Sequence, residues 1–415
     1  YPDLRGAPMI ELDLQTLTFG GDALGRLPDG RAVFVPFGLP GERVRVELVE
    51  EKPRHARARL VEVLRPAPER IAPRCPHFGI CGGCHYQHLP YDRQVQVKTE
   101  ILREQLVRIG GIENPPIAPM VAAPQPWNYR NTVQFHLDSA GRLGFEAWGG
   151  RGVVPISECH LPEPALNELW PQINFEPLPG IERVGLRLGV NAEILMALES
   201  SEPVAAPELE LDLPISVVHL SPEGPLVLAG DPGVWMSVKE TLFQVSAGAF
   251  FQVNTAQAAA LVDHLLARLP LSPAATVLDV YCGVGLFSRF IAPQVGQVIG
   301  IELSEAACDD YIVNLDAFDN VSLYVGAAEE VLPGLDVQPT AVIVDPPRAG
   351  LDRAALDALI RLGAPVLAYV SCDPATLARD ARRLLAAGYT LEQVTPFDLF
   401  PQTYHIESVS WFRRV

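Results

Sequence analysis

The stretch VLDVYCGVGLFS at residues 277–288 decides the fold of the C-terminal part of the chain. An apolar run typical of a buried parallel strand ends at Asp279 and leads to Gly283 and Gly285, which let the backbone approach a ligand closely. The pattern lacks the third glycine of the dinucleotide fingerprint, because Ser288 stands in the matching place. It therefore predicts a cofactor-binding turn, with a nucleotide site or a purely structural α/β turn as the alternative.

Strand-like and helical runs alternate from about residue 239 to residue 415. The runs QVIGIELS, SLYVGAAEE, TAVIVDPPRAG and APVLAYVSCDPATLARD read as strand ends, and a helical pattern begins after Asn254. This alternation predicts a parallel, doubly wound sheet. Glu302 closes the second strand, where a carboxylate can accept both ribose hydroxyls. Asp345 and two prolines close the fourth strand, an arrangement that grips a planar base. The glycine turn, Glu302 and the Asp-Pro-Pro motif together indicate an S-adenosylmethionine enzyme acting on a flat heterocycle.

Cys372 stands where a strand gives way to a helix and is the predicted nucleophile. A thiolate, not a thiol, attacks carbon, and the helix N-terminus from Asp373 onward is expected to favour the anion. The alternative is a buried inert cysteine. His405 and Glu407 are predicted to face one side of a strand, with Glu407 as the better base. These groups suggest thiolate addition to C6 of uracil, methylation of C5, removal of the C5 proton by Glu407 and elimination of Cys372.

A second cysteine site is predicted in CPHFGICGGCHYQH at residues 75–88, which places three cysteines in C-x5-C-x2-C spacing. The chain holds seven cysteines in 415 residues, an odd number that does not suggest a disulfide framework. A metal or catalytic site in a reducing cytoplasm is expected instead. Zinc would suit four thiolates chemically, although this spacing is unusual for zinc.

The N-terminal part is predicted to be a small barrel or sandwich, because short alternating strands with glycine turns fill residues 9–64. The net charge is −18, yet residues 1–110 hold 16 Lys and Arg against 14 Asp and Glu. A basic stripe over residues 52–74 can steer a phosphate backbone, with a solvated strand face as the alternative. A helix is predicted over 91–109, followed by a β-rich region over 115–235. No membrane helix is predicted.

The motifs together resemble the RNA uracil-5-methyltransferase family. Residues 21–50 resemble its TRAM barrel, an RNA-binding module, and CPHFGICGGCHYQHLPYDRQ resembles the cluster-binding stretch of its iron–sulfur subgroup. FFQVN, LDVYCGVG, DPPRAG, VSCDPATLARD and HIES resemble its catalytic motifs. The resemblance implies a TRAM barrel over residues 1–66, a β-rich central domain with an iron–sulfur cluster over 67–238 and a Rossmann-like methyltransferase domain over 239–415.

The resemblance also assigns residues. It implies Cys372 as nucleophile, Glu407 as proton acceptor, and a [4Fe-4S] cluster on Cys75, Cys81, Cys84 and Cys159. The positions that it places at the methyl donor or beside the target base are Gln252, Tyr281, Gly283, Gly285, Leu286, Glu302, Ala327 and Asp345. Leu286 and Ala327 stand where some members carry asparagine, so only backbone contacts are expected there. Arg130 and Asn131 resemble a family stretch that lies near RNA.

The family resemblance predicts an RNA substrate, ribosomal RNA ahead of transfer RNA, because the cluster and the barrel resemble the ribosomal enzymes. A cytoplasmic monomer with no DNA or membrane partner is expected. One alternative is an RNA-binding assembly factor without catalysis, which would predict damage at Cys372 or Glu407. The other is an amino-group methyltransferase, which would need no such pair.

Overall fold

The computed structural model describes residues 9–150, 152–173, 175–176, 178–207 and 213–414. The chain divides into two compact units. The first comprises the described residues of Tyr1–Leu102, Glu146–Gly152 and Phe400–His405, and the second comprises the described remainder. Among these residues, no helix has both the length and the apolar character needed to cross a membrane.

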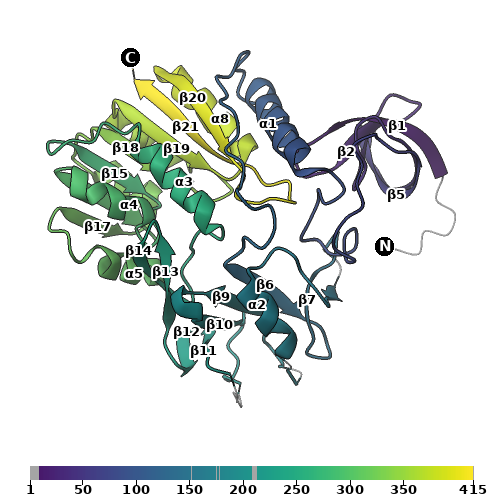
Figure 1. The fold of residues 1–415 in the computed structure, drawn as a ribbon. Helices are drawn as coiled ribbons and strands as arrows, with labels where there is room; N and C mark the ends of the chain where they lie inside the picture. Colours follow the sequence, from purple (N-terminus) through teal and green to yellow (C-terminus); the bar gives the residue numbers. More distant parts are fainter. Residues whose placement is uncertain (1–8, 151, 174, 177, 208–212, 415) are drawn as a thin grey trace. The chain divides into compact units, whose positions relative to one another are not determined.

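The first unit contains a closed five-stranded barrel with strand order β1-β2-β3-β5-β4 (Figure 1). Alternate residues point inward, so that Val44 and Val46 of β4 are fully buried while Arg43 is exposed. This confirms the predicted small barrel. Its strands are β1 (Met9–Leu17), β2 (Ala23–Arg26), β3 (Ala32–Val35), β4 (Arg43–Glu51) and β5 (His55–Arg65).

Helix α1 (Tyr91–Arg108) follows the cysteine-rich stretch and ends one residue before residue 109, where the predicted helix ends. Its buried Lys98 donates to the carbonyl of Phe400 at 3.0 Å. Its buried Gln94 accepts from the backbone N–H of Gln402 at 2.9 Å. These contacts explain why a short C-terminal segment belongs to the first unit.

The second unit contains a seven-stranded sheet with order β12-β11-β10-β9-β6-β7-β8, in which β10 and β11 are the parallel pair. It confirms the β-rich character predicted for residues 115–235. Phe135 and Leu186 of this sheet are fully buried and pack with Leu166 of α2 (Pro164–Leu169). The strands are β6 (Thr132–Leu137), β7 (Leu143–Glu146), β8 (Val153–Pro155), β9 (Arg183–Leu188), β10 (Ile194–Glu199), β11 (Ser216–Ser221) and β12 (Gly224–Ala229).

A hairpin of β13 (Gly233–Val238) and β14 (Thr241–Ser246) leads to α3 (Thr255–Leu266). The side chain of Asn254 caps α3 as predicted, because it accepts from the N–H of Gln257 at 3.2 Å. The predicted boundary at residues 238 and 239 falls at the turn of this hairpin, and the three-domain division stays a prediction.

The last sheet has the order β17-β16-β15-β18-β19-β21-β20. Its strands run parallel from β17 to β19, and β21 is antiparallel to both neighbours. From β15 the chain first adds β16 and β17 toward one edge of the sheet, and it then adds β18 and β19 on the other side of β15. Right-handed crossovers in the two directions place helices on both faces. The doubly wound topology is therefore confirmed.

Strands and helices alternate along the chain as far as α8, and the last two strands, β20 and β21, follow one another directly. The elements are β15 (Thr276–Val280), α4 (Leu286–Ile291), β16 (Gln297–Glu302), α5 (Glu305–Leu315), β17 (Val321–Val325), α6 (Ala328–Val331), β18 (Ala341–Val344), α7 (Arg353–Leu362), β19 (Val366–Ser371), α8 (Pro374–Ala386), β20 (Tyr389–Phe397) and β21 (Glu407–Arg414).

Candidate active site

The candidate active site lies where parallel strands β15, β16, β18 and β19 end at one edge of the sheet. Strand order reverses between β15 and β18, and ligands of open α/β sheets bind at such a switch point. Glu302 ends β16, Asp345 follows β18 and Cys372 follows β19. Ser371 pairs with Ser408 across β19 and β21, so Cys372 and Glu407 lie at the same end of neighbouring strands.

The loop after β15 has the left-handed backbone that its sequence requires. Gly283 and Gly285 have φ values of 53° and 90°. A Cβ atom on Gly285 would lie 2.4 Å from Cδ1 of Leu315, so only glycine fits there. Tyr281 has φ of 64°, a strained conformation for a residue with a side chain, of the kind that clusters at functional sites.

Asp279 and Ser288 explain how this loop holds its shape without a third glycine. Asp279 is fully buried and its Oδ2 accepts from the Ser288 hydroxyl at 2.6 Å and from the Ser288 N–H at 3.1 Å. Burial raises the pKa of Asp279 to about 6. Asp279 therefore stabilises the turn from inside rather than facing a ligand.

Glu302 lies beside the glycine loop and organises the surrounding backbone. Its Oε2 accepts from the N–H of Gly283 at 2.9 Å, and its Oε1 accepts from the N–H groups of Leu303 and Ser304 at 2.8 Å each. Each carboxylate oxygen has two lone pairs, so Oε1 is already satisfied and Oε2 retains capacity for one ribose hydroxyl. The predicted cofactor carboxylate is thus held rigidly at the strand end.

Leu286 and Ala327 differ from the other predicted cofactor positions. Leu286 opens α4 and its side chain is buried in the core, with 7% of its surface exposed. Ala327 is the N-cap of α6 and is half-buried. Neither side chain can donate or accept a hydrogen bond, in line with the expectation of backbone contacts only.

Four acidic groups act on one another electrostatically at the strand ends. Burial raises the pKa of Asp345 to about 7, helped by the charges of Asp279 and Glu302. Burial and then the charge of Asp345 raise the pKa of Glu407, while Arg348 opposes the shift. Glu407 is 3% exposed and its Oε1 has no hydrogen-bond partner among the described residues. Buried polar atoms are normally hydrogen-bonded, so this unpaired carboxylate oxygen calls for an explanation.

The expectation that the helix N-terminus favours the Cys372 thiolate is wrong for the ligand-free chain. Burial raises the pKa of Cys372 to about 12, and the charges of Glu407 and Asp345 add to the effect, while Arg348 opposes it. The cap explains part of this result. Oδ1 of Asp373 accepts the N–H groups of Ala375 and Thr376 at 2.9 Å each, so the helix end is already neutralised by a carboxylate.

His405 does not share a strand with Glu407, contrary to the prediction. Strand β21 begins at Glu407, and His405 belongs to the segment assigned to the first unit. The His405 ring lies against the rings of Tyr404 and Phe400, with centroids 4.3 and 5.6 Å apart. The strand alternation does not reach His405, because the strand begins only at Glu407.

Gln252 lies in a segment that is held by the central sheet. The side-chain amide of Asn131 donates to the carbonyl of Gln252 and to the hydroxyl of Thr255, both at 3.0 Å, and its backbone N–H donates to Val253 at 3.0 Å. Asn131 is 2% exposed, so its side chain positions this segment, and the resemblance of this stretch to one near RNA stays a prediction. Arg130 is half-buried.

Arg187 is a supporting residue that the sequence analysis missed. It belongs to β9 and donates to the carbonyls of Ser246 and Ala249 at 2.8 and 2.7 Å. Burial lowers the pKa of Arg187 to about 10. An arginine in an alternating strand carries no sequence signal for this role, because its partners are backbone atoms about 60 residues away.

The cysteine-rich stretch lies in irregular structure of the first unit. Cys75, Cys81 and Cys84 are half-buried, and Sγ of Cys81 accepts from the N–H of Gly83 at 3.4 Å. Burial raises the pKa of Cys81. Cys159 follows β8 in the second unit. In the described parts of the chain, no group of three or more His, Cys, Asp or Glu side chains is arranged to hold a metal ion.

The sheet order, the glycine loop and the neighbouring cysteine and glutamate define the class as S-adenosylmethionine-dependent base methyltransferases. A family model described as tRNA (Uracil-5-)-methyltransferase matches residues 233–415, and a TRAM domain model matches residues 9–61. The chain is 35% identical to an uncharacterized RNA methyltransferase of Thermosynechococcus vestitus over 97% of each chain. It is 35% identical to one of Streptomyces coelicolor, over 96% of this chain and 92% of the relative.

A solved structure extends the likeness to the whole fold. The crystal structure of Pyrococcus abyssi tRNA (uracil-54, C5)-methyltransferase with S-adenosyl-L-homocysteine matches with a TM-score of 0.72 and 25% identity, over 97% of this chain and 100% of that chain. The chain belongs to the RNA uracil-5-methyltransferase family and carries an N-terminal TRAM domain.

Proposed function

We propose that the protein methylates C5 of a uridine in RNA, with S-adenosylmethionine as the methyl donor. The observation that carries the proposal is the placement of Cys372 and Glu407 at the same end of paired strands β19 and β21. A nucleophile for C6 and an acceptor for the C5 proton must act on adjacent atoms of one ring. An amino-group methyltransferase would have no use for this pair.

The residues of the chain have separate tasks in the proposed reaction. The sulfur of Cys372 forms a bond to C6, which makes C5 nucleophilic, and S-adenosylmethionine supplies the methyl group that C5 takes. Oε1 of Glu407 then accepts the C5 proton, the C5–C6 double bond forms again, and the carbon–sulfur bond breaks. Because the pKa of Cys372 is raised in the ligand-free chain, ionisation is expected to accompany substrate binding.

The residues proposed to hold the methyl donor surround the end of β15. Oε2 of Glu302 would accept one of its ribose hydroxyls, and the backbone at Gly283 would lie along it, since a Cβ atom on Gly283 would meet nothing within 4 Å. Tyr281 and Gln252 complete the proposed set of contacts. Asp345, with its pKa raised to about 7 by burial, would bond either the donor or the uracil edge.

The proposed target is ribosomal RNA, because the barrel together with the cysteine-rich stretch resembles the architecture of the ribosomal enzymes. Transfer RNA is the second candidate, favoured by the likeness to the Pyrococcus abyssi tRNA enzyme. In both cases the uridine must leave its stack, at a cost of roughly a few kcal/mol, which a loop or single strand lowers.

We also propose a [4Fe-4S] cluster on Cys75, Cys81, Cys84 and Cys159. Four thiolates suit iron–sulfur ligation, and the N–H to sulfur bond at Cys81 is of the kind that tunes such clusters. Zinc is the alternative for the same donors. The reaction above contains no electron transfer, so the proposed cluster is structural. Iron and acid-labile sulfide analysis after anaerobic purification distinguishes it from zinc.

Mass spectrometry with 5-fluorouridine-substituted RNA tests the reaction. Fluorine at C5 cannot leave as a proton, so protein, RNA and S-adenosylmethionine should form a methylated covalent adduct that Cys372→Ala cannot form. An adduct with transfer RNA and none with ribosomal RNA would reverse the order of substrates. No adduct with either would overturn the C6-addition mechanism and favour an RNA-binding factor.

A further inference from the structure

Helix α8 carries a buried carboxylate, Asp380, that has no task in the proposed reaction. Asp380 is 1% exposed. Its Oδ2 accepts from the hydroxyl of Tyr369 at 2.9 Å and from the N–H of Leu351 at 3.0 Å, while Nε of Arg379 donates to Oδ1 at 2.8 Å. A buried charge is costly unless it is paired and hydrogen-bonded, so its retention needs a reason.

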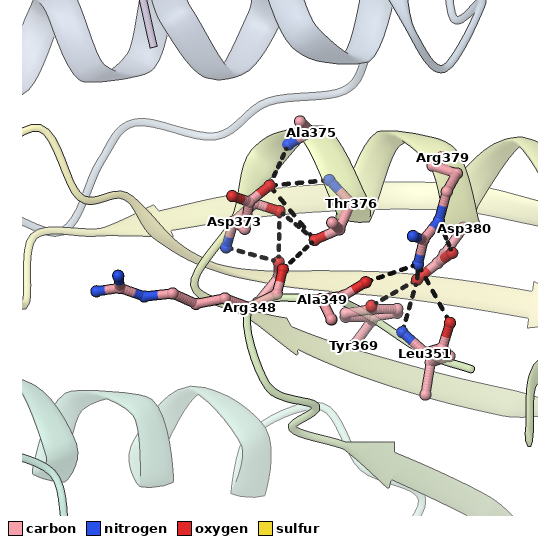
Figure 2. Close-up of polar contacts among 10 residues, drawn as sticks. Arg348, Ala349, Leu351, Tyr369, Asp373, Ala375, Thr376, Arg379 and Asp380 are labelled. Atoms are coloured by element: carbon pink, nitrogen blue, oxygen red, sulfur yellow. Dashed lines mark hydrogen bonds and ion pairs between the residues drawn. The ribbon is translucent and has the colours of Figure 1, made fainter. Parts of the chain in front are cut away.

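The partners of Asp380 connect α8 to the loop that follows the Asp-Pro-Pro motif. Nη2 of Arg379 donates to the carbonyls of Ala349 and Leu351 at 3.0 and 3.2 Å. One turn earlier on α8, the hydroxyl of Thr376 donates to the carbonyl of Arg348 at 3.3 Å. Figure 2 shows side chains of α8 bonded in this way to the backbone of residues 348–351.

Gly350 shows how closely the loop and the helix approach. Its φ is +74°, and a Cβ atom there would lie 2.6 Å from Nη2 of Arg379 and 2.8 Å from Oδ2 of Asp380. A side chain at this position would therefore separate the loop from α8.

The loop carries a charge that acts on the reacting groups. Arg348 is the first residue that α8 holds, and its guanidinium points away from the Arg379–Asp380 network (Figure 2). Its positive charge opposes the upward shift in the pKa of both Cys372 and Glu407. Helix α8 begins just after Cys372. It also holds the backbone of Arg348, whose charge acts on Cys372.

We propose that Asp380, together with Tyr369 and Arg379, is a positioning residue that holds the loop carrying Arg348 at the neighbouring strand ends where Cys372 and Glu407 lie. The proposal rests on the proposed function for its consequence in catalysis. The positioning of the Arg348 loop by the buried Asp380 carboxylate of α8 applies to the ligand-free chain as well.

The test compares Asp380→Asn and Tyr369→Phe with Asp357→Asn. The control variant breaks the ion pair between Asp357 of α7 and Arg383 of α8, which does not involve residues 348–351. Two rates are measured at pH 8: alkylation of Cys372 by iodoacetamide in the ligand-free protein, resolved by peptide mass spectrometry, and methyl transfer to RNA. Thermal unfolding monitors the fold.

Both test variants should slow alkylation by about threefold or more and lower kcat by about tenfold, because the thiolate loses its cation. The KM for S-adenosylmethionine should stay within about twofold, since the hydrogen bonds of Asp380 given above join it to Tyr369, Leu351 and Arg379 and not to Gly283, Gly285 or Glu302. The control should behave as the wild type. Arg348→Ala should cause the same losses, and Arg348→Ala with Asp380→Asn should cause no further loss, because coupled residues are not additive.

Additive losses in the double variant, or wild-type rates in a folded Asp380→Asn protein, would overturn the proposal. If Asp380→Asn does not fold, Tyr369→Phe removes one hydrogen bond and carries the same double-variant test. A wild type that methylates no RNA would overturn the proposed function, and the alkylation rates would still decide the role of Asp380.

Discussion

The two cysteine sites of this chain differ in where their evidence lies. The stretch 75–88 is conspicuous in sequence, with three cysteines in ten residues, yet in the structure these half-buried thiols lie in irregular backbone. Cys372 is a single cysteine, but two paired strands, a capped helix and three charged groups surround it. Ligand spacing is a local property of sequence, whereas a reactive thiol depends on groups brought together by the fold.

The largest expected effect is at Cys372. Cys372→Ala should lower methyl transfer by a factor of about 10³ or more, because the nucleophile is lost while substrate binding is kept. Methyl transfer from labelled S-adenosylmethionine to an RNA transcript measures it. Cys308→Ala is the matched control, since Cys308 is a buried cysteine of α5 that the proposed reaction does not use. A residual activity above about one-tenth would reduce Cys372 to a structural residue.

Glu407→Gln should separate activity from stability. Loss of the base should trap a covalent, methylated RNA adduct and lower turnover by about 10²-fold or more. The same change should raise the free energy of unfolding at pH 8 by about 1–2 kcal/mol, because it removes a buried carboxylate with an unpartnered oxygen. Urea unfolding and gel analysis of the adduct measure the two effects.

The stability gain of Glu407→Gln should depend on pH in one direction. The folded-state pKa of Glu407 is raised above its ordinary value of 4.5, so the folded wild type holds this proton more tightly than the unfolded chain. The gain should be small near pH 4.5 and should grow as pH rises above that value. A gain that is equal at pH 4.5 and pH 8 would contradict the buried-charge explanation.

Substitution of a cysteine in the stretch 75–88 should lower the iron content and the thermal stability of the protein more than its ability to form the RNA adduct. Cys81→Ser should lower the iron content markedly and reduce thermal stability, as expected when a structural metal site loses a ligand. Adduct formation by the protein that remains folded should fall by less than about tenfold. Iron analysis and melting curves, with Cys308→Ser as control, measure this. A loss as large as that of Cys372→Ala would erase the contrast between the two sites.

The smallest effect concerns the reactivity of Cys372 before substrate binds. With its pKa raised to about 12, its alkylation by iodoacetamide should keep rising about tenfold per pH unit from pH 8 to pH 10. An ordinary thiol, with a pKa near 8.5, would instead level off above that value. A plateau at pH 9 would show that the thiol is already activated in the ligand-free chain.

Much of the candidate site was predictable, because each residue terminates a strand with a local signature. The glycine loop, Glu302, Asp345 and Cys372 were all placed correctly at strand ends. The predictions that failed needed information from distant residues. The helix effect on Cys372 was overruled by burial and by the Asp373 cap, and His405 lay outside the strand assumed for it.

The sequence by itself determined the element order, the TRAM-type barrel, the doubly wound sheet and the identity of the paired cysteine and glutamate. Hydrophobic periodicity, turn residues and short motifs are local, so these features can be read along the chain. Only the tertiary structure decided which way the Cys372 pKa moves, how Asn131 and Arg187 hold the Gln252 segment, and how Asp380 binds the Arg348 loop. These properties arise from burial, and from hydrogen bonds and charges between segments that meet only in the folded protein.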